Sequence, residues 1–489
     1  MSRLSYEAFL AQRKEIIQQE ESRALGADIV LTEDETKVNE FVMKLKKAEL
    51  EEGFNAPVEF APSRHFFQVL DKISQSPLYQ LLRKMPKGGI LHTHDTAMGN
   101  TDAIIQATHR EHLWQSGDFG GSNPIHYRFS KTKPAPIDGA GEWHLVSDIR
   151  KELGSEKYDL NVKNLLSLFH QDPHHAYHCV NHVWSKFAQI FITLEPLVTY
   201  KPVWDEYYLH ALEQTYADNV CYVEFRGLLP PVYDLEGKIY TSEEIVQNYI
   251  DLTEQFQQAH PDFVGVKFIY APLRIVDDNT YAQYFDTAEK LHKRFPTFMA
   301  GFDLVGQEDL GRPFTDVNDR LLNMSPTIQF FFHAGETNWC GLSDDNLIDA
   351  ILLGTKRIGH GFAAVKHPRV LEEIKKRNIC IELNPISNQV LKLVDDMRNH
   401  VGAILFSDNY PVVVSSDDPA FWCASPLSHD FYVAFLGLAS ARQDLRLLKK
   451  LALNSIEYSA MSPAEKDEAK QKWTVAWNKF IAETLKSIS

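Results

Sequence analysis

Histidine and carboxylate side chains recur at the ends of short apolar runs in this chain, and together they could bind a metal ion. The runs end in His92-Thr93-His94, His333-Ala334-Gly335-Glu336, Gly359-His360-Gly361 and Ser416-Asp417-Asp418-Pro419. Alternate residues of a β-strand project to the same face, so His92 and His94 can point at one ion. Three imidazoles and a carboxylate suit Zn²⁺ and leave one coordination position for water.

The motifs are informative only as a set. In a chain with 20 histidines among 489 residues, about one His-x-His pair arises by chance. Taken singly, each histidine is better explained as an ordinary hydrogen-bonded residue at a strand end. A third histidine, a nearby glutamate and the Asp417-Asp418 pair follow at later strand ends, in an order that a barrel could bring together. The combination therefore favours a metal site.

Eight short apolar runs alternate with helical stretches from residue 86 onward. They span residues 89–92, 221–225, 264–270, 298–303, 327–332, 357–360, 379–383 and 412–415. Strands separated by helices pair in parallel, and eight of them predict an α/β fold of the (β/α)₈ TIM-barrel type. The active site of that architecture lies at the carboxyl ends of the strands, and the motifs fall at the ends of strands one, five, six and eight.

We expect an N-terminal helical region over residues 1–85 and a barrel over residues 86–489. Thr32 and Glu35 have the spacing of a capping box that begins a helix. An apolar stripe follows at helical spacing, formed by Val38, Phe41, Val42 and Leu45. Such an arm packs either on its own barrel or on a second copy of the chain, and the sequence favours neither. The dimer is the prediction to test, because the stripe has no obvious partner within so short a segment.

The connection between the first and second strands is too long for one crossover helix, so we expect an insertion over about residues 100–180. Its part from Gly117 to Gly141 is rich in Gly, Pro and Ser and predicts a loop, whereas Val162 to Val198 is periodic enough to contain helices. An insertion after strand one lies over the mouth of a barrel. We therefore expect it to act as a lid or to shape the substrate pocket.

Composition excludes several classes of partner. The 50 Lys and Arg residues against 66 Asp and Glu give a net charge of −16, which repels nucleic acid and anionic membranes. The five cysteines form no CxxC pair and predict neither a disulfide framework nor a zinc ribbon. The first residues lack the apolar core of a signal peptide, so we expect a cytoplasmic protein. Secretion is the alternative if a leader has been removed.

A dense group of histidines in the insertion offers a second place for chemistry. It comprises His174, His175, His178 and His182. On one helix the last three would share a face, which is a possible metal stripe. No carboxylate stands at matching positions, so we interpret the group as a polar helix face, with contact to substrate as the alternative.

Longer phrases around these motifs resemble the adenosine deaminases, and specifically the branch called adenosine deaminase-related growth factors. They are MPKGGILHTHD, GFDLVGQED, FFHAGET, RIGHGF, NPISNQVL and SSDDPAFW, with WSKF and LVTY in the insertion. The resemblance runs through most of the chain. It implies a zinc-dependent (β/α)₈ deaminase that is dimeric through its N-terminal helices and uses the insertion to help bind a purine nucleoside.

The resemblance also implies roles for individual residues. The implied ligands of one Zn²⁺ per chain are His92, His94, His333 and Asp417. Glu336 is the implied proton donor, and His360 the residue that orients and deprotonates water. The implied substrate-binding residues are Asp95, Trp184, Gly306 and Asp418. The sequence departs from the branch in two ways: residues 95–178 lack the cysteines of its secreted members, and Leu273 stands where a histidine is usual.

Three functions are consistent with these observations. The first is deamination of adenosine or 2′-deoxyadenosine. The second is another zinc-dependent purine or amide hydrolysis on the same fold, because a barrel and its metal do not fix the substrate. The third is a growth-factor-like extracellular signalling protein with a vestigial site, which would require none of the proton carriers identified above.

Overall fold

The computed structural model describes residues 3–121 and 123–488 and contains a closed barrel of parallel strands. The barrel strands are β1 (Gly88–Ile90), β5 (Val220–Gly227), β6 (Gly265–Tyr270), β7 (Met299–Phe302), β8 (Gln329–Phe330), β9 (His333–Ala334), β10 (Arg357–His360), β11 (Cys380–Leu383) and β12 (Val412–Val414). They form two parallel sheets, in the orders β1-β5-β6-β7-β8 and β12-β11-β10-β9. A parallel bridge between Thr93 and Asp417 joins the two sheets on the side of β1 and β12.

All eight predicted strands are present, and the prediction of a (β/α)₈ barrel is confirmed. The fifth predicted strand is divided into β8 and β9. The chain changes neighbours there, because β8 pairs with β7 whereas β9 pairs with β10. This change of partner closes the barrel on its second side.

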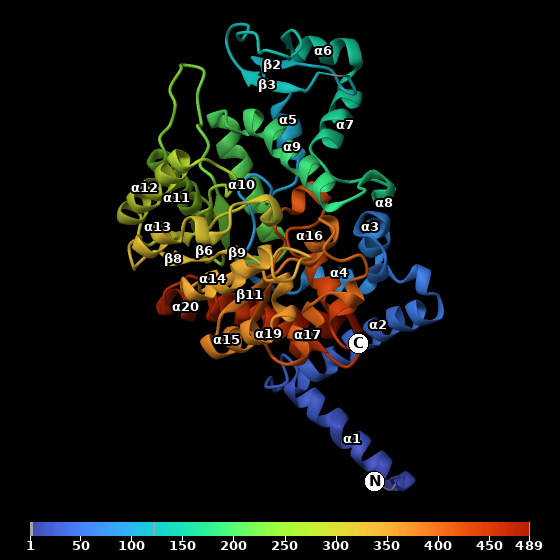
Figure 1. Ribbon diagram of the computed structural model, residues 1–489. Coiled ribbons are helices and arrows are strands. Elements are labelled where there is room, and N and C mark those ends of the chain that lie inside the picture. Colours follow the sequence, from blue (N-terminus) through green and yellow to red (C-terminus); the bar gives the residue numbers. More distant parts are fainter. Residues whose placement is uncertain (1–2, 122, 489) are drawn as a thin grey trace.

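Helices surround the strands (Figure 1). Those in the barrel region are α10 (Lys201–Ala217), α11 (Ser242–Ala259), α12 (Asp278–Arg294), α13 (Asn318–Asn323), α14 (Asn346–Leu352), α15 (Pro368–Arg377), α16 (Pro385–Val390), α17 (Gly402–Ser407), α18 (Ser428–Val433), α19 (Leu445–Glu457) and α20 (Pro463–Ile488). None of the helices in the described residues is long and apolar enough to cross a membrane. The five cysteines are all free.

The N-terminal region consists of α1 (Tyr6–Arg23), α2 (Glu33–Asn55), α3 (Phe66–Gln75) and α4 (Pro77–Lys84). The capping box of Thr32 and Glu35 forms as predicted and begins α2. Of the two arrangements that the sequence left open for the stripe on α2, the structure shows packing within the same chain. Val38 and Val42 are fully buried, and α2 packs against α20, α4 and α19 of the same chain. By contrast, α1 contains no buried residue and projects from the body (Figure 1).

The insertion forms a separate lobe at the end of the molecule opposite α1 (Figure 1). It contains α5 (Asp102–Ala107), β2 (Leu113–Ser116), β3 (His126–Phe129), β4 (His144–Leu145), α6 (Val146–Leu153), α7 (Ser155–Leu165), α8 (Pro173–Ala176) and α9 (Val180–Val198). The three strands make an antiparallel sheet in the order β3-β2-β4. The prediction of a loop from Gly117 to Gly141 is therefore wrong at β3. There Tyr127 and Phe129 are buried in alternation with more exposed residues, a pattern too short to stand out among the flanking Gly and Pro residues.

Candidate metal and catalytic centre

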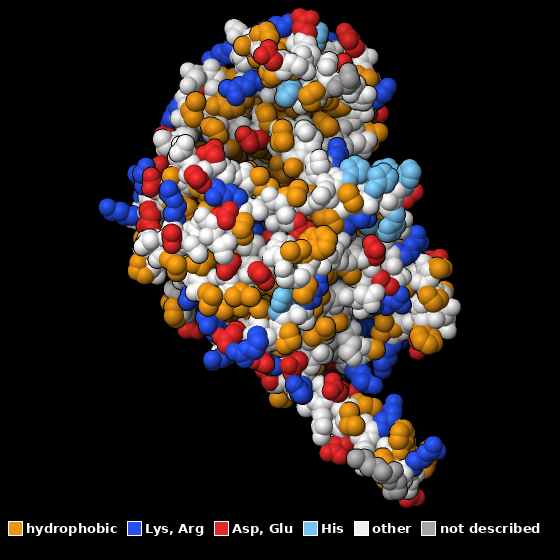
Figure 2. Space-filling model, viewed as in Figure 1, with side chains coloured by type: hydrophobic (Ala, Val, Ile, Leu, Met, Phe, Trp, Pro, Cys, Tyr) orange, Lys and Arg blue, Asp and Glu red, His pale blue; other side chains and the backbone are white. Residues whose placement is uncertain are grey.

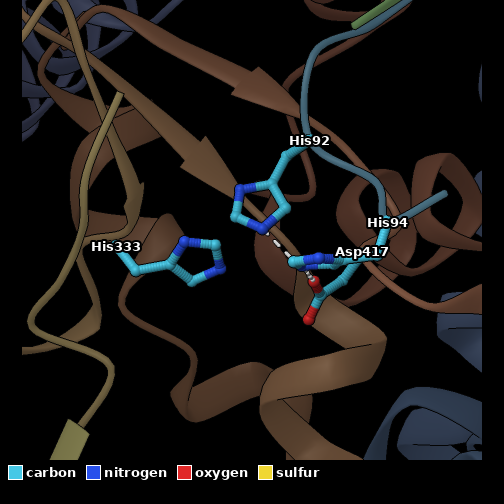
Figure 3. A group of neighbouring side chains, drawn as sticks. All are labelled: His92, His94, His333 and Asp417. Atoms are coloured by element: carbon cyan, nitrogen blue, oxygen red, sulfur yellow. Dashed lines mark ion pairs between the residues drawn. The ribbon is translucent and has the colours of Figure 1, made fainter. Parts of the chain in front are cut away.

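The four implied metal ligands come together at the carboxyl end of the barrel (Figure 3). One ligand atom from each of His92, His94, His333 and Asp417 lies within 4.8 Å of all the others. Oδ1 of Asp417 is 3.2 Å from Nε2 of His92 and 3.0 Å from Nε2 of His94. His92 and His94 follow β1, His333 begins β9 and Asp417 follows β12, so the barrel gathers residues that are far apart in sequence. We call this group the three-histidine cluster.

Buried polar atoms at this cluster lack hydrogen-bond partners among the described residues. They are Nε2 of His92, Oδ1 of Asp417, Oε1 of Glu336, Nε2 of His360 and Oδ1 of Asp418. Buried polar atoms are nearly always paired, so a concentration of unpaired ones indicates a place for a ligand. Imidazole nitrogens with a carboxylate oxygen are the donors that a divalent transition metal prefers. The residues present therefore fit a metal ion of the Zn²⁺ type.

The electrostatics of the cluster favour the metal-binding forms of its side chains. Burial lowers the pKa of His94 and lowers that of His333 to about 3, so both imidazoles are neutral at pH 7. Burial alone would raise the pKa of Asp417, but the close imidazoles of His92 and His94 outweigh it and hold the pKa well below its usual value. His94 and His333 as neutral imidazoles and Asp417 as an ionised carboxylate are in the forms that bind a cation.

A buried network of charges orients two of the histidines from behind. Nδ1 of His92 is 2.7 Å from Glu382, and Nδ1 of His333 is 2.6 Å from Asp303. Arg226 donates to both carboxylates, at 2.7 Å in each case. Each carboxylate accepts a proton held on Nδ1, which leaves the Nε2 lone pair for a metal.

Arg226, Asp303 and Glu382 were not predicted from the sequence to belong to the site. Their signal was a charged residue inside an apolar strand run, as in Ile381-Glu382-Leu383 and Phe302-Asp303. Such residues are almost never fully buried unless they are paired. A charge in the middle of a buried strand thus indicates an internal ion pair.

Glu336 and His360 border the cluster, as their motifs predict. Burial, together with the nearby Asp417 and Glu308 carboxylates, raises the pKa of Glu336 well above its usual value. Oε1 of Glu336 is 3.6 Å from Nδ1 of His360, whose Nε2 lies 3.8 Å from Oδ2 of Asp417. The amide of Asn388 also contacts Nδ1 of His360, at 3.0 Å. The protein thus favours the protonated form of Glu336 beside a neutral His360 imidazole, whose pKa burial holds well below its usual value.

Two residues of the centre have a backbone conformation that is unusual for side chains with a Cβ. His360 has a φ angle of 62° and Asp417 of 61°, both in the left-handed region. Such conformations cost free energy and cluster at functional sites. His360 ends β10, and Asp417 follows β12. A left-handed residue interrupts the extended backbone, so the alternation of side chains along a strand does not predict where these two side chains point.

Asp418 and Asp95, two of the implied substrate-binding residues, are both buried and have raised pKa values. Burial and the Asp417 carboxylate raise the pKa of Asp418 well above its usual value. Burial raises the pKa of Asp95 to about 7, although its carboxylate accepts hydrogen bonds from the Thr96 N–H and the Tyr249 hydroxyl. Both carboxyl groups are thus able to carry a proton near neutral pH.

Trp184 and Gly306 lie on segments that border the barrel mouth. Trp184 is half-buried on α9 and packs on Phe187, which in turn contacts Phe421 in the turn after Asp418. Gly306, with a φ of +108°, lies in the loop after β7. In that loop the Gln307 side chain donates to the Asn181 side chain at the start of α9, at 2.7 Å. This bond, which the sequence did not predict, attaches the insertion to the barrel.

The dense histidine group of the insertion does not form one helical face. α8 ends at Ala176, His178 lies between helices and His182 belongs to α9, because Pro173 begins one helix and a new one starts at Val180. The group is exposed and forms the pale blue patch beside α8 (Figure 2). The rings of His178 and His182 stack 5.5 Å apart.

Comparisons with known proteins agree with this geometry. A family model described as Adenosine deaminase matches residues 176–473, and one described as Adenosine/AMP deaminase N-terminal matches residues 2–82. An Adenosine deaminase from Aedes albopictus is 56% identical over 97% of this chain and 89% of its own length. The human Adenosine deaminase 2 is 41% identical over 96% of this chain and 93% of its own length.

Solved structures share the fold at low sequence identity. An Arabidopsis N6-mAMP deaminase superposes with a TM-score of 0.55 at 15% identity, covering 81% of this chain and 99% of its own. An adenine deaminase from Arthrobacter aurescens gives a TM-score of 0.52 at 18% identity, covering 81% of this chain and 99% of its own. The resemblance drawn from the sequence motifs is confirmed. The chain belongs to the adenosine deaminase family, in the branch of the adenosine deaminase-related growth factors.

Proposed function

We propose that this protein catalyses the hydrolytic deamination of adenosine and 2′-deoxyadenosine to inosine and 2′-deoxyinosine, with release of ammonia. The observation that carries the proposal is the juxtaposition of the three-histidine cluster with Glu336, whose pKa is raised, and His360, whose pKa is lowered. Relatives named Adenosine deaminase, at 41% to 56% identity over nearly the full chain, support it.

We infer one Zn²⁺ per chain, held by His92, His94, His333 and Asp417. Three imidazoles with one carboxylate support this ion over hard cations, which prefer oxygen ligands alone. When bound, zinc lowers the pKa of a coordinated water to about 7 and so supplies the nucleophile.

The protein's own groups supply the proton transfers. Deamination requires a hydroxyl group to add to the ring carbon that carries the amino group, a proton to reach the ring nitrogen, and ammonia to leave. Burial raises the pKa of Glu336 and so favours the form that carries a transferable proton, and we assign it as the donor to the ring nitrogen. His360 is held by Asn388 with Nε2 toward Asp417, and we assign it to orient the attacking water and accept its proton.

Substrate contacts follow from the groups that line the same mouth. A protonated Asp418 can donate a hydrogen bond to an acceptor nitrogen of the purine. We assign Gly306 a backbone contact with the purine. A Cβ added at Gly306 would have its nearest neighbour, Cγ of Arg274, at 3.9 Å, so the space beside this backbone is open. Asp95 is a further candidate for a substrate contact. Trp184 on the insertion is assigned to the ribose side, where Leu273 is too apolar to replace the histidine usual in this branch.

We further propose that the protein is a homodimer through its N-terminal region, with α1 rather than α2 as the contact. The large apolar side chains Leu4, Tyr6, Phe9, Leu10 and Ile16 are all exposed on or just before α1. A twofold pairing of two such arms would remove these side chains from water.

The alternative functions have less support. A signalling protein with a vestigial site would not require a buried Glu336 with a raised pKa, or unpaired atoms on His92 and Asp417. Another purine or amide substrate on the same fold is tested by direct comparison. We expect purified protein with assayed zinc to change the ultraviolet absorbance of adenosine much faster than that of AMP or adenine. Equal rates on the three compounds, or turnover of adenine alone, would contradict the assignment.

A further inference from the structure

A second group of potential metal ligands lies at the same edge of the barrel as the three-histidine cluster. It consists of Cys340, Asp344 and His367, which each offer one ligand atom within 4.8 Å of the other two. Cys340 and Asp344 belong to the loop after β9, and His367 lies in the loop after β10. The group therefore connects the loop that follows Glu336 to the loop that follows His360. We call it the cysteine group.

The Asp344 carboxylate is the most fixed member of the cysteine group. It is fully buried, and its Oδ1 accepts a hydrogen bond of 2.8 Å from the Leu342 N–H. Its Oδ2 lies 2.5 Å from Nε2 of His367. Burial alone would raise the pKa of Asp344, but the Leu342 N–H and the His367 imidazole outweigh it and lower the pKa. An ionised, oriented oxygen therefore faces an imidazole nitrogen.

Cys340 completes the group from the solvent side. Its side chain is exposed, and its thiol has no hydrogen-bond partner among the described residues. The loop around it is anchored, because Lys366 donates to the carbonyl oxygens of Asn338 and Trp339 at 2.6 and 3.2 Å. The thiol is thus presented to the Asp344 and His367 pair by a restrained backbone, with access for an ion from solution.

We propose that Cys340, Asp344 and His367 bind a second, thiophilic divalent cation of the Zn²⁺ type, separate from the three-histidine cluster. A thiolate, an imidazole and a carboxylate are soft to borderline donors, which excludes Ca²⁺ and Mg²⁺ as preferred ions. Bonds of about 2.3 Å to sulfur and about 2.1 Å to nitrogen and oxygen place ligand atoms some 3 to 4 Å apart around a tetrahedron. The cysteine group reaches that geometry if the His367 ring moves away from Asp344 by about 1 Å, with water as the fourth ligand.

The change in bonding on cation binding is balanced. The Cys340 thiol releases its proton to solvent and bonds through sulfur. The hydrogen bond between His367 and Asp344 is replaced by two bonds to the ion. The proton on Nε2 of His367 moves to Nδ1 through solvent, and the imidazole then binds the ion through its Nε2 lone pair. Because one ion then joins both loops, its binding restrains the segments that begin at Glu336 and His360.

Cobalt distinguishes the two sites spectroscopically. A thiolate bound to Co²⁺ gives a charge-transfer absorption in the near ultraviolet, whereas the three-histidine cluster contains no sulfur. Holoprotein carrying one equivalent of metal is titrated with Co²⁺, and bound metal is counted after gel filtration. We expect the absorption to rise with the second equivalent, and excess Zn²⁺ to abolish it. No such absorption, or no second equivalent, would overturn the proposal.

Two cysteine variants locate the second ion. Cys340→Ser should lose both the absorption and the second equivalent while keeping the first equivalent and its melting temperature, since the side chain is exposed. Cys179→Ser is the matched control, because Cys179 is also exposed but adjoins His178 in the histidine patch. It should keep both. If Cys179→Ser loses the absorption or Cys340→Ser retains it, the ion is bound elsewhere and the proposal fails.

Discussion

Nδ1 of His92 lies 2.7 Å from Oε2 of Glu382, and both side chains are completely excluded from solvent. Glu382 also accepts hydrogen bonds from Arg226 and Arg357, at 2.7 and 2.5 Å. The carboxylate is therefore held in place by two guanidinium groups while it fixes the imidazole. The charged interior of the barrel therefore fixes the orientation of the His92 imidazole, an implied metal ligand.

Glu382→Gln should weaken metal binding by about 10- to 100-fold, because the amide accepts the His92 proton less strongly and disturbs both arginines. Competition with a chelator measures the affinity. Glu224→Gln is the control, since Glu224 pairs with Arg357 at 2.6 Å in the same network but does not touch a histidine of the cluster. Both variants should melt earlier, but only Glu382→Gln should lose metal affinity. Equal affinities in the two variants would show that the contact with His92 has no orienting role.

The strands and the residues of the metal site could be predicted from the sequence because both depend on local patterns. Apolar runs mark buried parallel strands, and the motifs stand at their ends. What the sequence did not predict depends on tertiary contacts. α2, which carries Val38 and Val42, packs against α20, more than 400 residues away, and nothing local in α2 indicates this partner. The link between Gln307 and Asn181 likewise exists only once the insertion is folded.

Glu336→Gln should keep the metal and lose activity by about 10² or more, because the amide preserves the shape but has no transferable acid proton. The kcat for adenosine, with the metal content of each preparation, measures this. A general acid works only when protonated, and burial raises the pKa of Glu336. Activity that depends on this proton should thus persist above the pH at which an ordinary glutamate loses its proton, and decline as the pH rises through the raised pKa of Glu336. A variant with normal kcat would remove Glu336 from the proton transfer.

Gly359→Ala should impair the metal site through sterics alone. A Cβ at Gly359 would lie 2.9 Å from Cε1 of His92, closer than real Cβ contacts allow. The ring would have to leave its position, and we expect less bound zinc and lower kcat. Gly89→Ala, on β1, is the control, because its Cβ would crowd Tyr222 at 3.1 Å and no member of the three-histidine cluster. Full zinc in Gly359→Ala would mean that the backbone shifts instead of the ring.

Deletion of residues 1–24 should convert a dimer into a monomer, as measured by light scattering. The deletion removes α1, which has no buried residue, and leaves the packed helix α2 intact. A deletion up to Pro86 would be a poor test, because it would also remove Val38 and Val42 from the core. Metal content and melting temperature of the shortened protein serve as controls for folding. A shortened protein that remains dimeric places the contact outside α1.

Trp184→Ala distinguishes a role in the substrate pocket from a role in packing. Trp184 is half-buried, whereas Phe187 one turn later on α9 is buried among Phe421 and Trp422. If Trp184 contacts the nucleoside, its loss should reduce kcat/KM for adenosine with little change in melting temperature. Phe187→Ala is the comparison, since removal of a core aromatic costs about 3 to 5 kcal/mol of folding free energy.

The same variants test why a nucleoside should be preferred over the free base. A pocket that binds ribose through an aromatic face and polar groups loses both contacts when adenine replaces adenosine. Trp184→Ala should therefore narrow the difference in kcat/KM between the two compounds, whereas Phe187→Ala should leave the ratio unchanged below its melting transition. If Trp184→Ala melts as early as Phe187→Ala and keeps the wild-type ratio, Trp184 is a packing residue of α9, and the ribose is bound by other side chains of the insertion.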